Sequence, residues 1–144
     1  VASINKDHIE KLKKEINFSE TSPINLFKTK CDIISPCALG GAINALNKSE
    51  LQCKSIVGAA NNQLEDSTIG EWLNKNNIVY APDYLVNSGG VIAIASEINK
   101  TENLIEEQLK KIGDRLTSVL EESKRSREST NLVAKRIAWE RINS

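Results

Sequence analysis

Residues 31–41 read CDIISPCALGG, a short β-branched run followed at once by a loop of small residues. Two later stretches share this design: residues 56–63 read IVGAANNQ, and residues 78–90 read IVYAPDYLVNSGG. Glycine and other small residues let a backbone come close to a ligand. In an open α/β sheet the ligand lies beyond the carboxyl ends of the parallel strands. The three loops therefore predict one edge of a binding cleft.

The apolar runs recur every 22 or 23 residues, at residues 33–34, 56–57 and 78–80. Short continuous β-branched runs are typical of strands buried on both faces of a parallel sheet. The spacing leaves room for a crossover helix between one strand and the next. The sequence therefore predicts βαβ units and an α/β fold.

Helices are expected at residues 7–15, 41–53 and 66–76. Asp66 or Ser67 can cap the third of these helices, because short polar side chains accept hydrogen bonds from free N–H groups in the first turn. Residues 1–4 indicate the end of a further strand that precedes the first helix.

The last third of the chain has a helical pattern. One apolar stripe steps by four and three residues, through Ile105, Leu109, Ile112, Leu116 and Val119. We expect this helix to pack on its own domain, with a contact between subunits as the alternative. Ser129 or Thr130 can start a final helix whose inward residues are Leu132, Val133, Ile137, Ala138 and Ile142. We place the boundary between a partial sheet domain, residues 1–100, and C-terminal helices, residues 101–144, which pack on it or on another domain.

Charge and cysteine content exclude several classes of function. Nineteen basic and nineteen acidic residues cancel, so no overall field attracts nucleic acid or an anionic membrane. No run approaches the roughly 20 apolar residues of a membrane span, and nothing resembles a signal peptide. Three cysteines without a Cys-x-x-Cys pair, and a single histidine, argue against a disulfide framework or a metal site. We expect reduced thiols and a cytoplasmic location.

Side-chain amides follow two of the predicted strands. Asn61 and Asn62 each offer a donor and an acceptor, which suits a nicotinamide ribose or the polar head of a substrate. The alternative is that they cap a helix or hold a turn. Asn87, which precedes two glycines, has the same two interpretations.

Cys37 and Asp83 are candidate reactive groups in the loops. The chain's one histidine, His8, falls in the first expected helix, so Cys37 has no apparent base and is expected to pack as a small apolar residue. Asp83 could act as an acid or base. The interpretation we favour is a loop carboxylate that accepts hydrogen bonds from nearby N–H groups.

The chain contains no G-x-G-x-x-G motif, the turn that binds a dinucleotide pyrophosphate at a helix N-terminus. Its first residues match the end of the second strand of such a fold. We therefore expect a Rossmann-like, mostly parallel sheet that lacks the first βα unit and has helices at its C-terminal end. Because the chain starts at Val1 and contains no methionine, we expect it to be a piece of a longer protein.

The three motifs together resemble the glutamate, leucine, phenylalanine and valine dehydrogenases, and most closely the branch that acts on leucine and other branched-chain amino acids. The resemblance extends to residues 1–6, similar to the end of the second strand, and to residues 133–142, similar to the last helix. It implies a two-domain oxidoreductase that converts an L-amino acid to its 2-oxo acid and ammonia and passes hydride to NAD. In that family the catalytic lysines and aspartate lie in another domain, so the resemblance implies no catalytic residue here and an inactive isolated chain.

The resemblance also implies roles for residues of the loops. The residues that would contact the cofactor are Cys37, Ala38 and Leu39 in its pocket, Ala60 and Asn61 near the nicotinamide ribose, and Asn87 at the nicotinamide end. Asn61 would also reach the substrate.

Val91 and Ile94 match positions of the family's side-chain pocket. An apolar wall cannot satisfy a substrate carboxylate, so glutamate is disfavoured, and branched aliphatic side chains suit the wall better than a large ring. Leucine, valine and isoleucine stay open as substrates.

Ser3 stands where the family usually has an acidic residue that holds the adenosine ribose. A serine binds more weakly than a carboxylate and does not repel a 2′-phosphate, so NADP is an alternative to NAD. The small-molecule partners would be an amino acid and its 2-oxo acid, and we expect a homo-oligomer. The alternatives to an enzyme are a non-catalytic nucleotide-binding or regulatory module and a structural piece that assembles through its C-terminal helices.

Overall fold

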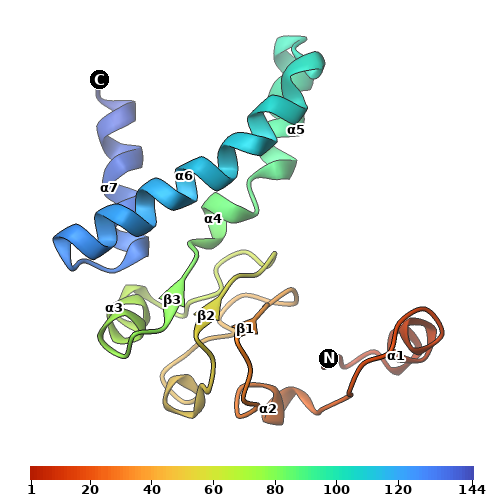
Figure 1. Cartoon of the computed structure of the whole chain (residues 1–144). Coiled ribbons are helices and arrows are strands. Elements are labelled where there is room, and N and C mark those ends of the chain that lie inside the picture. The colour runs from red at the N-terminus through yellow and green to blue at the C-terminus, as the bar shows by residue number, and fades with distance from the viewer.

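Three short parallel strands form the centre of the structure, a computed structural model that describes residues 1–144 (Figure 1). The strands are β1 (Ile33–Ile34), β2 (Ser55–Ile56) and β3 (Val79–Tyr80). They lie in the order β1-β2-β3 and run in the same direction. The α/β class and the parallel sheet expected from the sequence are confirmed.

The sheet buries one side chain from each strand. Ile34, Ile56 and Tyr80 lie in the core, whereas Ile33 is 59% exposed. Further core residues come from the loops and from the helix between β2 and β3, and the buried set is completed by Ile43, Cys53, Ile69, Leu73 and Ile78. Full burial of one such aliphatic side chain stabilises the fold by about 1.5–3 kcal/mol. The expectation that the strands are buried on both faces is wrong, because Ile33 of β1 and Val79 of β3 are exposed on the other face. Helices α3 (Ser67–Lys75) and α7 (Thr130–Ile142) both pack against β3.

Helix α3 begins as the sequence predicts. The Asp66 carboxylate accepts hydrogen bonds from the backbone N–H groups of Thr68 at 2.7 Å and Ile69 at 3.3 Å. The hydroxyl and N–H of Thr68 lower the pKa of the Asp66 carboxyl, because both donate to its charged form. Asp66 is therefore the cap, and Ser67 is the first helical residue.

The helix expected at residues 41–53 is absent, and a loop with one 3₁₀ turn, η1 (Lys48–Glu50), takes its place. Side-chain amides bind the backbone that a helix would need: Asn44 Oδ1 accepts from Leu46 N at 3.0 Å, and Asn47 Nδ2 donates to Ala42 O at 2.7 Å. Such local bonds compete with helical ones. Ile43 also pairs with Leu64 as an isolated parallel bridge.

The N-terminal segment differs from its prediction in one respect. Helix α1 (Lys6–Lys13) lies where a helix was expected and places His8 at the surface. The strand expected at residues 1–4 is irregular, because the backbone of Val1 bonds to Ser19 and Thr21 rather than to a strand. The short helix α2 (Pro23–Leu26) leads from there to β1.

Four further helical segments follow β3 before the last helix: α4 (Asp83–Val86), α5 (Gly89–Asn99), η2 (Glu102–Leu104) and α6 (Ile105–Ser126). Helix α6 packs on α4, α5 and α7, so both predicted C-terminal helices are confirmed. Val119, Val133 and Ala134 form a second small core. Ile142 is 76% exposed and Ala138 is also exposed, so their predicted inward orientation is wrong. The boundary at residue 100 stays a prediction.

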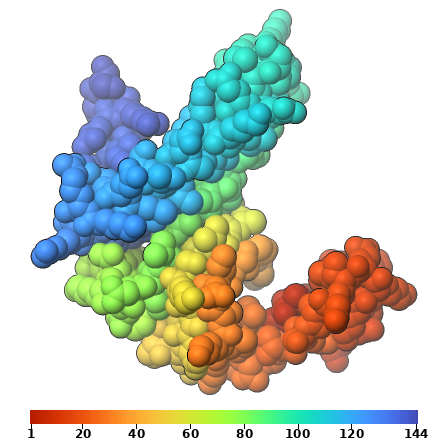
Figure 2. Space-filling model, in the orientation of Figure 1, coloured from red at the N-terminus to blue at the C-terminus, as the bar shows by residue number.

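Helices α6 and α7 diverge from their junction, and Figure 2 shows them as separate projections beyond the sheet. An open groove of about 650 Å³ lies between them, lined by residues that include Leu85, Val119 and Ile137.

No helix combines the length and apolar character needed to cross a lipid bilayer.

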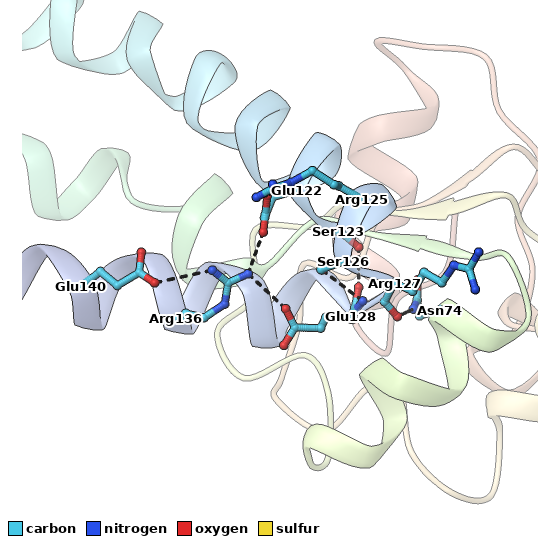
Figure 3. Close-up of polar contacts among 9 residues, drawn as sticks. All are labelled: Asn74, Glu122, Ser123, Arg125, Ser126, Arg127, Glu128, Arg136 and Glu140. Atoms are coloured by element: carbon cyan, nitrogen blue, oxygen red, sulfur yellow. Dashed lines mark hydrogen bonds and ion pairs between the residues drawn. The ribbon is translucent and has the colours of Figure 1, made fainter.

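An ionic cluster holds the junction between α6 and α7 (Figure 3). The Arg136 guanidinium donates to Glu122 at 2.9 Å and to Glu128 at 3.0 Å. Arg125 and Arg136 lower the pKa of the Glu122 carboxyl by donating to it. The turn itself bends at Arg127, whose φ is 63°, and its carbonyl accepts from Asn74 Nδ2 of α3 at 3.0 Å. The ion pairs therefore hold α6 against α7, and the Asn74–Arg127 contact ties their junction to α3.

Replacing Gly58 should destabilise the fold. A β-carbon there would lie 2.6 Å from Pro36 Cδ and closer still to the Pro36 carbonyl oxygen. We expect Gly58→Ala to lower the free energy of unfolding by roughly 1–3 kcal/mol, because the two backbone segments would have to separate. Urea denaturation followed by circular dichroism measures the change.

Gly113→Ala is the matched control. Gly113 lies inside α6, and a β-carbon added to it would have no neighbour within 4 Å. Alanine should raise helix stability there by about 0.5–1 kcal/mol. Equal effects of the two substitutions would contradict the close approach of Gly58 to Pro36.

Candidate binding site

The three small-residue segments lie side by side at the carboxyl ends of the strands, and the third of them contains α4 and the start of α5 (Figure 1). We call residues 35–41 loop 1, residues 58–63 loop 2 and residues 80–90 loop 3. Loops 1 and 2 join through hydrogen bonds from Ala60 N to Pro36 O at 3.0 Å and from Gly41 N to Asn62 O at 2.7 Å. Asn61 and Asn87 join loops 2 and 3. The predicted arrangement of the loops along one edge is confirmed.

Glycine in these loops serves the contact between loops. Gly58 lies against Pro36, and a β-carbon on Gly40 would lie 3.1 Å from the carbonyl oxygens of both Asn61 and Asn62. A β-carbon at residue 58 would force the two loops apart, and one at residue 40 would make a tight contact. These two glycines therefore allow loops 1 and 2 to pack closely.

Asn61 and Asn87 form a pair with unused hydrogen-bonding capacity. Asn87 Nδ2 donates to Asn61 Oδ1 at 2.6 Å and lies 3.4 Å from the carbonyl oxygens of Ala59 and Ala60. Asn61 Nδ2 and Asn87 Oδ1 make no hydrogen bond within the chain, and Asn61 is exposed. The pair thus offers one free donor and one free acceptor. Asn62, by contrast, has a φ of 53° and holds the turn, as its alternative interpretation states.

A buried polar group lies below the amide pair and includes Gln63, a residue of the second motif to which the sequence alone assigned no role. Gln63 has 0% of its surface exposed, and its Nε2 donates to Gly58 O at 2.7 Å and to Ala60 O at 2.9 Å. Its backbone N–H donates to Asp83 Oδ2 at 3.3 Å. The only signal in the sequence is a third amide directly after Asn61 and Asn62.

Asp83 is a buried residue of loop 3 that contacts loop 2. Its carboxylate accepts from Gln63 N–H and from the Tyr80 hydroxyl at 3.1 Å, which agrees with the favoured interpretation of a loop carboxylate. Burial, together with the charge of Asp83, raises the pKa of Tyr80, so that its hydroxyl stays neutral and donates. The Tyr80 carbonyl accepts from the Thr130 hydroxyl at 2.6 Å, which fixes the start of α7 to the end of β3.

Cys37 is exposed, so the expectation that it packs as a small apolar residue is wrong. Loop 1 turns outward after buried Pro36 and carries Cys37, Ala38 and Leu39 at the surface. The Ser35 hydroxyl, 3.4 Å from Cys37 Sγ, and the backbone N–H of Ala59 lower the pKa of the Cys37 thiol. Both donors stabilise the thiolate.

The remaining predicted residues lie on α5 and at the N-terminus. Val91 and Ile94 are 70% and 61% exposed near the start of α5, and their separation of three places them on one face. Ser3 lies in the irregular N-terminal segment, where its hydroxyl accepts from Asn5 N–H at 3.1 Å. The structure shows no hydrogen bond between Ser3 and the three loops.

The family model described as glutamate/leucine/phenylalanine/valine dehydrogenase matches residues 2–144. Leucine dehydrogenase of Bacillus cereus is 39% identical over 147 residues, which cover 100% of this chain and 40% of that protein. Phenylalanine dehydrogenase of Thermoactinomyces intermedius is 37% identical, covering 99% of this chain and 40% of that protein. The chain thus spans about two fifths of the length of these relatives.

A solved structure has the same fold over nearly all of the chain. The crystal structure of L-tryptophan dehydrogenase from Nostoc punctiforme superposes with a TM-score of 0.94 at 35% sequence identity. The match covers 99% of this chain and 43% of that one. The sheet, the loops and the C-terminal helices therefore follow an arrangement known from experiment.

The three cysteines should differ in reactivity. Burial raises the pKa of the Cys53 thiol, whereas the pKa of the exposed Cys37 thiol is lowered. Because the thiolate is the reactive form, iodoacetamide at neutral pH should label Cys37 first and Cys53 last. Peptide mass spectrometry over a time course measures the order, with urea-unfolded protein as the control. Equal labelling of Cys37 and Cys53 in the native protein would contradict the placement of loop 1.

Proposed function

This chain belongs to the glutamate/leucine/phenylalanine/valine dehydrogenase family, and we propose that it is part of an enzyme that deaminates a branched-chain L-amino acid. The reaction would convert the amino acid to its 2-oxo acid and ammonia, reversibly. When bound, NAD would supply the chemistry by accepting a hydride. The role proposed for this chain is to hold the cofactor and to form one wall of the substrate cleft.

The observation that carries this proposal is the Asn61–Asn87 pair. Their mutual bond of 2.6 Å leaves Asn61 Nδ2 free to donate and Asn87 Oδ1 free to accept. A ribose hydroxyl both donates and accepts, so it matches this pair. Asn61 Nδ2 can also donate to a carboxylate oxygen of the substrate. We therefore assign the nicotinamide ribose to Asn61 and Ala60, and the nicotinamide end to Asn87.

Loop 1 fits the cofactor by its shape. Cys37, Ala38 and Leu39 lie exposed on a segment that Pro36 and Gly40 hold against loop 2. The small side chains of Cys37 and Ala38 next to a fixed backbone let a flat ring come close. We propose that residues 37–39 line the cofactor pocket and that Ser3 faces the adenosine ribose, with NAD as the cofactor and NADP as the alternative that a serine at this position leaves open.

The substrate side chain is proposed to lie against Val91 and Ile94. Both are apolar and exposed on one face of α5. A buried carboxylate there would have no partner, which disfavours glutamate. Relatives are named for leucine and phenylalanine, and a difference of one methylene changes binding by only about 1–3 kcal/mol. The wall alone therefore supports an aliphatic substrate without selecting one branched chain.

Steady-state turnover by the full-length protein tests this function. With NAD, we expect kcat/KM to be about tenfold or more higher for leucine or valine than for phenylalanine, and higher still than for glutamate. These 144 residues expressed alone should show no turnover. A preference for glutamate would overturn the pocket assignment. Binding of NADH without turnover of any amino acid would favour a non-catalytic nucleotide-binding module.

Asn61→Ala tests the assignment of the amide pair. The substitution removes the free donor and the acceptor that orients Asn87, so kcat/KM for leucine should fall about 10- to 100-fold. Asn103→Ala is the matched control, because Asn103 is exposed in η2, away from the loops. Unchanged kinetics of Asn61→Ala would remove Asn61 from the site.

A further inference from the structure

Gln63, the last residue of loop 2, is buried in a way that core packing does not explain. Its Oε1 atom has no hydrogen-bond partner, although the whole residue is 0% exposed. A buried acceptor without a donor costs stability, and an apolar side chain of similar volume would avoid that cost. An unsatisfied buried group therefore calls for a separate explanation.

The two Nε2 protons of Gln63 provide one. They bind the carbonyl oxygens of Gly58 at 2.7 Å and Ala60 at 2.9 Å, which belong to the turn that presents Asn61. The Ala60 carbonyl is part of the peptide plane that leads into Asn61. Holding that plane sets the direction in which the Asn61 side chain leaves the backbone.

The same carbonyl connects Gln63 to the third loop. Asn87 Nδ2 lies 3.4 Å from Ala60 O while it donates to Asn61 Oδ1 at 2.6 Å. Gln63 Nε2 and Asn87 Nδ2 therefore share the Ala60 carbonyl oxygen as an acceptor. A change in the Ala60 peptide would move both members of the amide pair.

The backbone of Gln63 is itself held by a hydrogen bond to loop 3. Its backbone N–H donates to Asp83 Oδ2 at 3.3 Å, and Asp83 Oδ1 accepts from the Tyr80 hydroxyl at 3.1 Å. Thr130 Oγ1 donates to the Tyr80 carbonyl at 2.6 Å. A continuous set of contacts thus connects Thr130 at the start of α7 to Gln63 at the end of loop 2.

We propose that Gln63 is a positioning residue that orients Asn61 and Asn87 through the Ala60 carbonyl. Its consequence for deamination rests on the proposed function, whereas its consequence for the geometry of the amide pair does not. Gln63 touches neither substrate nor cofactor in this assignment. It acts by fixing the peptide that carries the contacting side chain.

Gln63→Met in the full-length protein tests the proposal, because methionine fills a similar volume without donors. A crystal structure of this variant should show the Asn61–Asn87 bond lost, and kcat/KM for leucine should fall about 10- to 100-fold. Gln52→Met is the matched control, since Gln52 is exposed. An intact Asn61–Asn87 bond in Gln63→Met would overturn the proposal.

A double-mutant cycle separates positioning from a general structural role. If Gln63 acts through Asn61, Gln63→Met should add little to the loss already caused by Asn61→Ala. Losses that multiply in the double variant would overturn the proposal, because independent effects are additive in free energy.

Gln63→Leu is the second variant if Gln63→Met does not fold. It also removes both amide donors to the carbonyl oxygens of Gly58 and Ala60 and leaves a buried apolar side chain. A displaced Asn61–Asn87 pair in its crystal structure would support the proposal, and an unchanged pair would overturn it. A wild-type protein without deaminase activity would overturn the proposed function alone, since the crystallographic comparison still decides the role of Gln63.

Discussion

The close approach of Gly58 to Pro36 is the constraint on which the cleft depends. Loop 2 can lie against loop 1 only because residue 58 has no side chain, and the bond from Ala60 N to Pro36 O at 3.0 Å then closes the contact. This contact fixes the position of Ala60 and Asn61 relative to loop 1. The third loop reaches the same place through Asn87. Hydrogen bonds thus join the loops that follow the three strands into one continuous surface.

Buried polar side chains connect the loops to the rest of the fold. Thr130, Tyr80, Asp83 and Gln63 link α7, β3, loop 3 and loop 2 by hydrogen bonds that are largely removed from water. Such bonds are directional, so they fix orientation where dispersion contacts would tolerate sliding. In our proposal, these directional hydrogen bonds fix the orientation of the Asn61–Asn87 pair.

Much of this architecture follows from local sequence. The positions of β1, β2 and β3, the cap at Asp66 and the two long C-terminal helices each rest on a pattern of neighbouring residues, and the structure confirms them. The loops at 35–41, 58–63 and 80–90 could be placed together because parallel strands end at the same edge.

The features that could not be predicted depend on contacts between distant segments. Nothing local shows that Asn44 and Asn47 bind the backbone in place of a helix, or that Val1 pairs with residues 19–21. The burial of Gln63 could not be predicted either, because the tertiary fold brings its backbone N–H to Asp83 of loop 3. The exposure of Cys37 likewise follows from the turn after Pro36 and not from the composition of loop 1.

A crystal structure of the full-length protein with NAD bound tests the central claim most directly. The assignment of Asn61 and Asn87 predicts a nicotinamide ribose hydroxyl within about 3 Å of Asn61 Nδ2, with Asn87 facing the nicotinamide end of the cofactor. Loop 1 should lie along the same cofactor. A cofactor that binds elsewhere, or a ribose that makes no contact with the Asn61–Asn87 pair, would contradict the account.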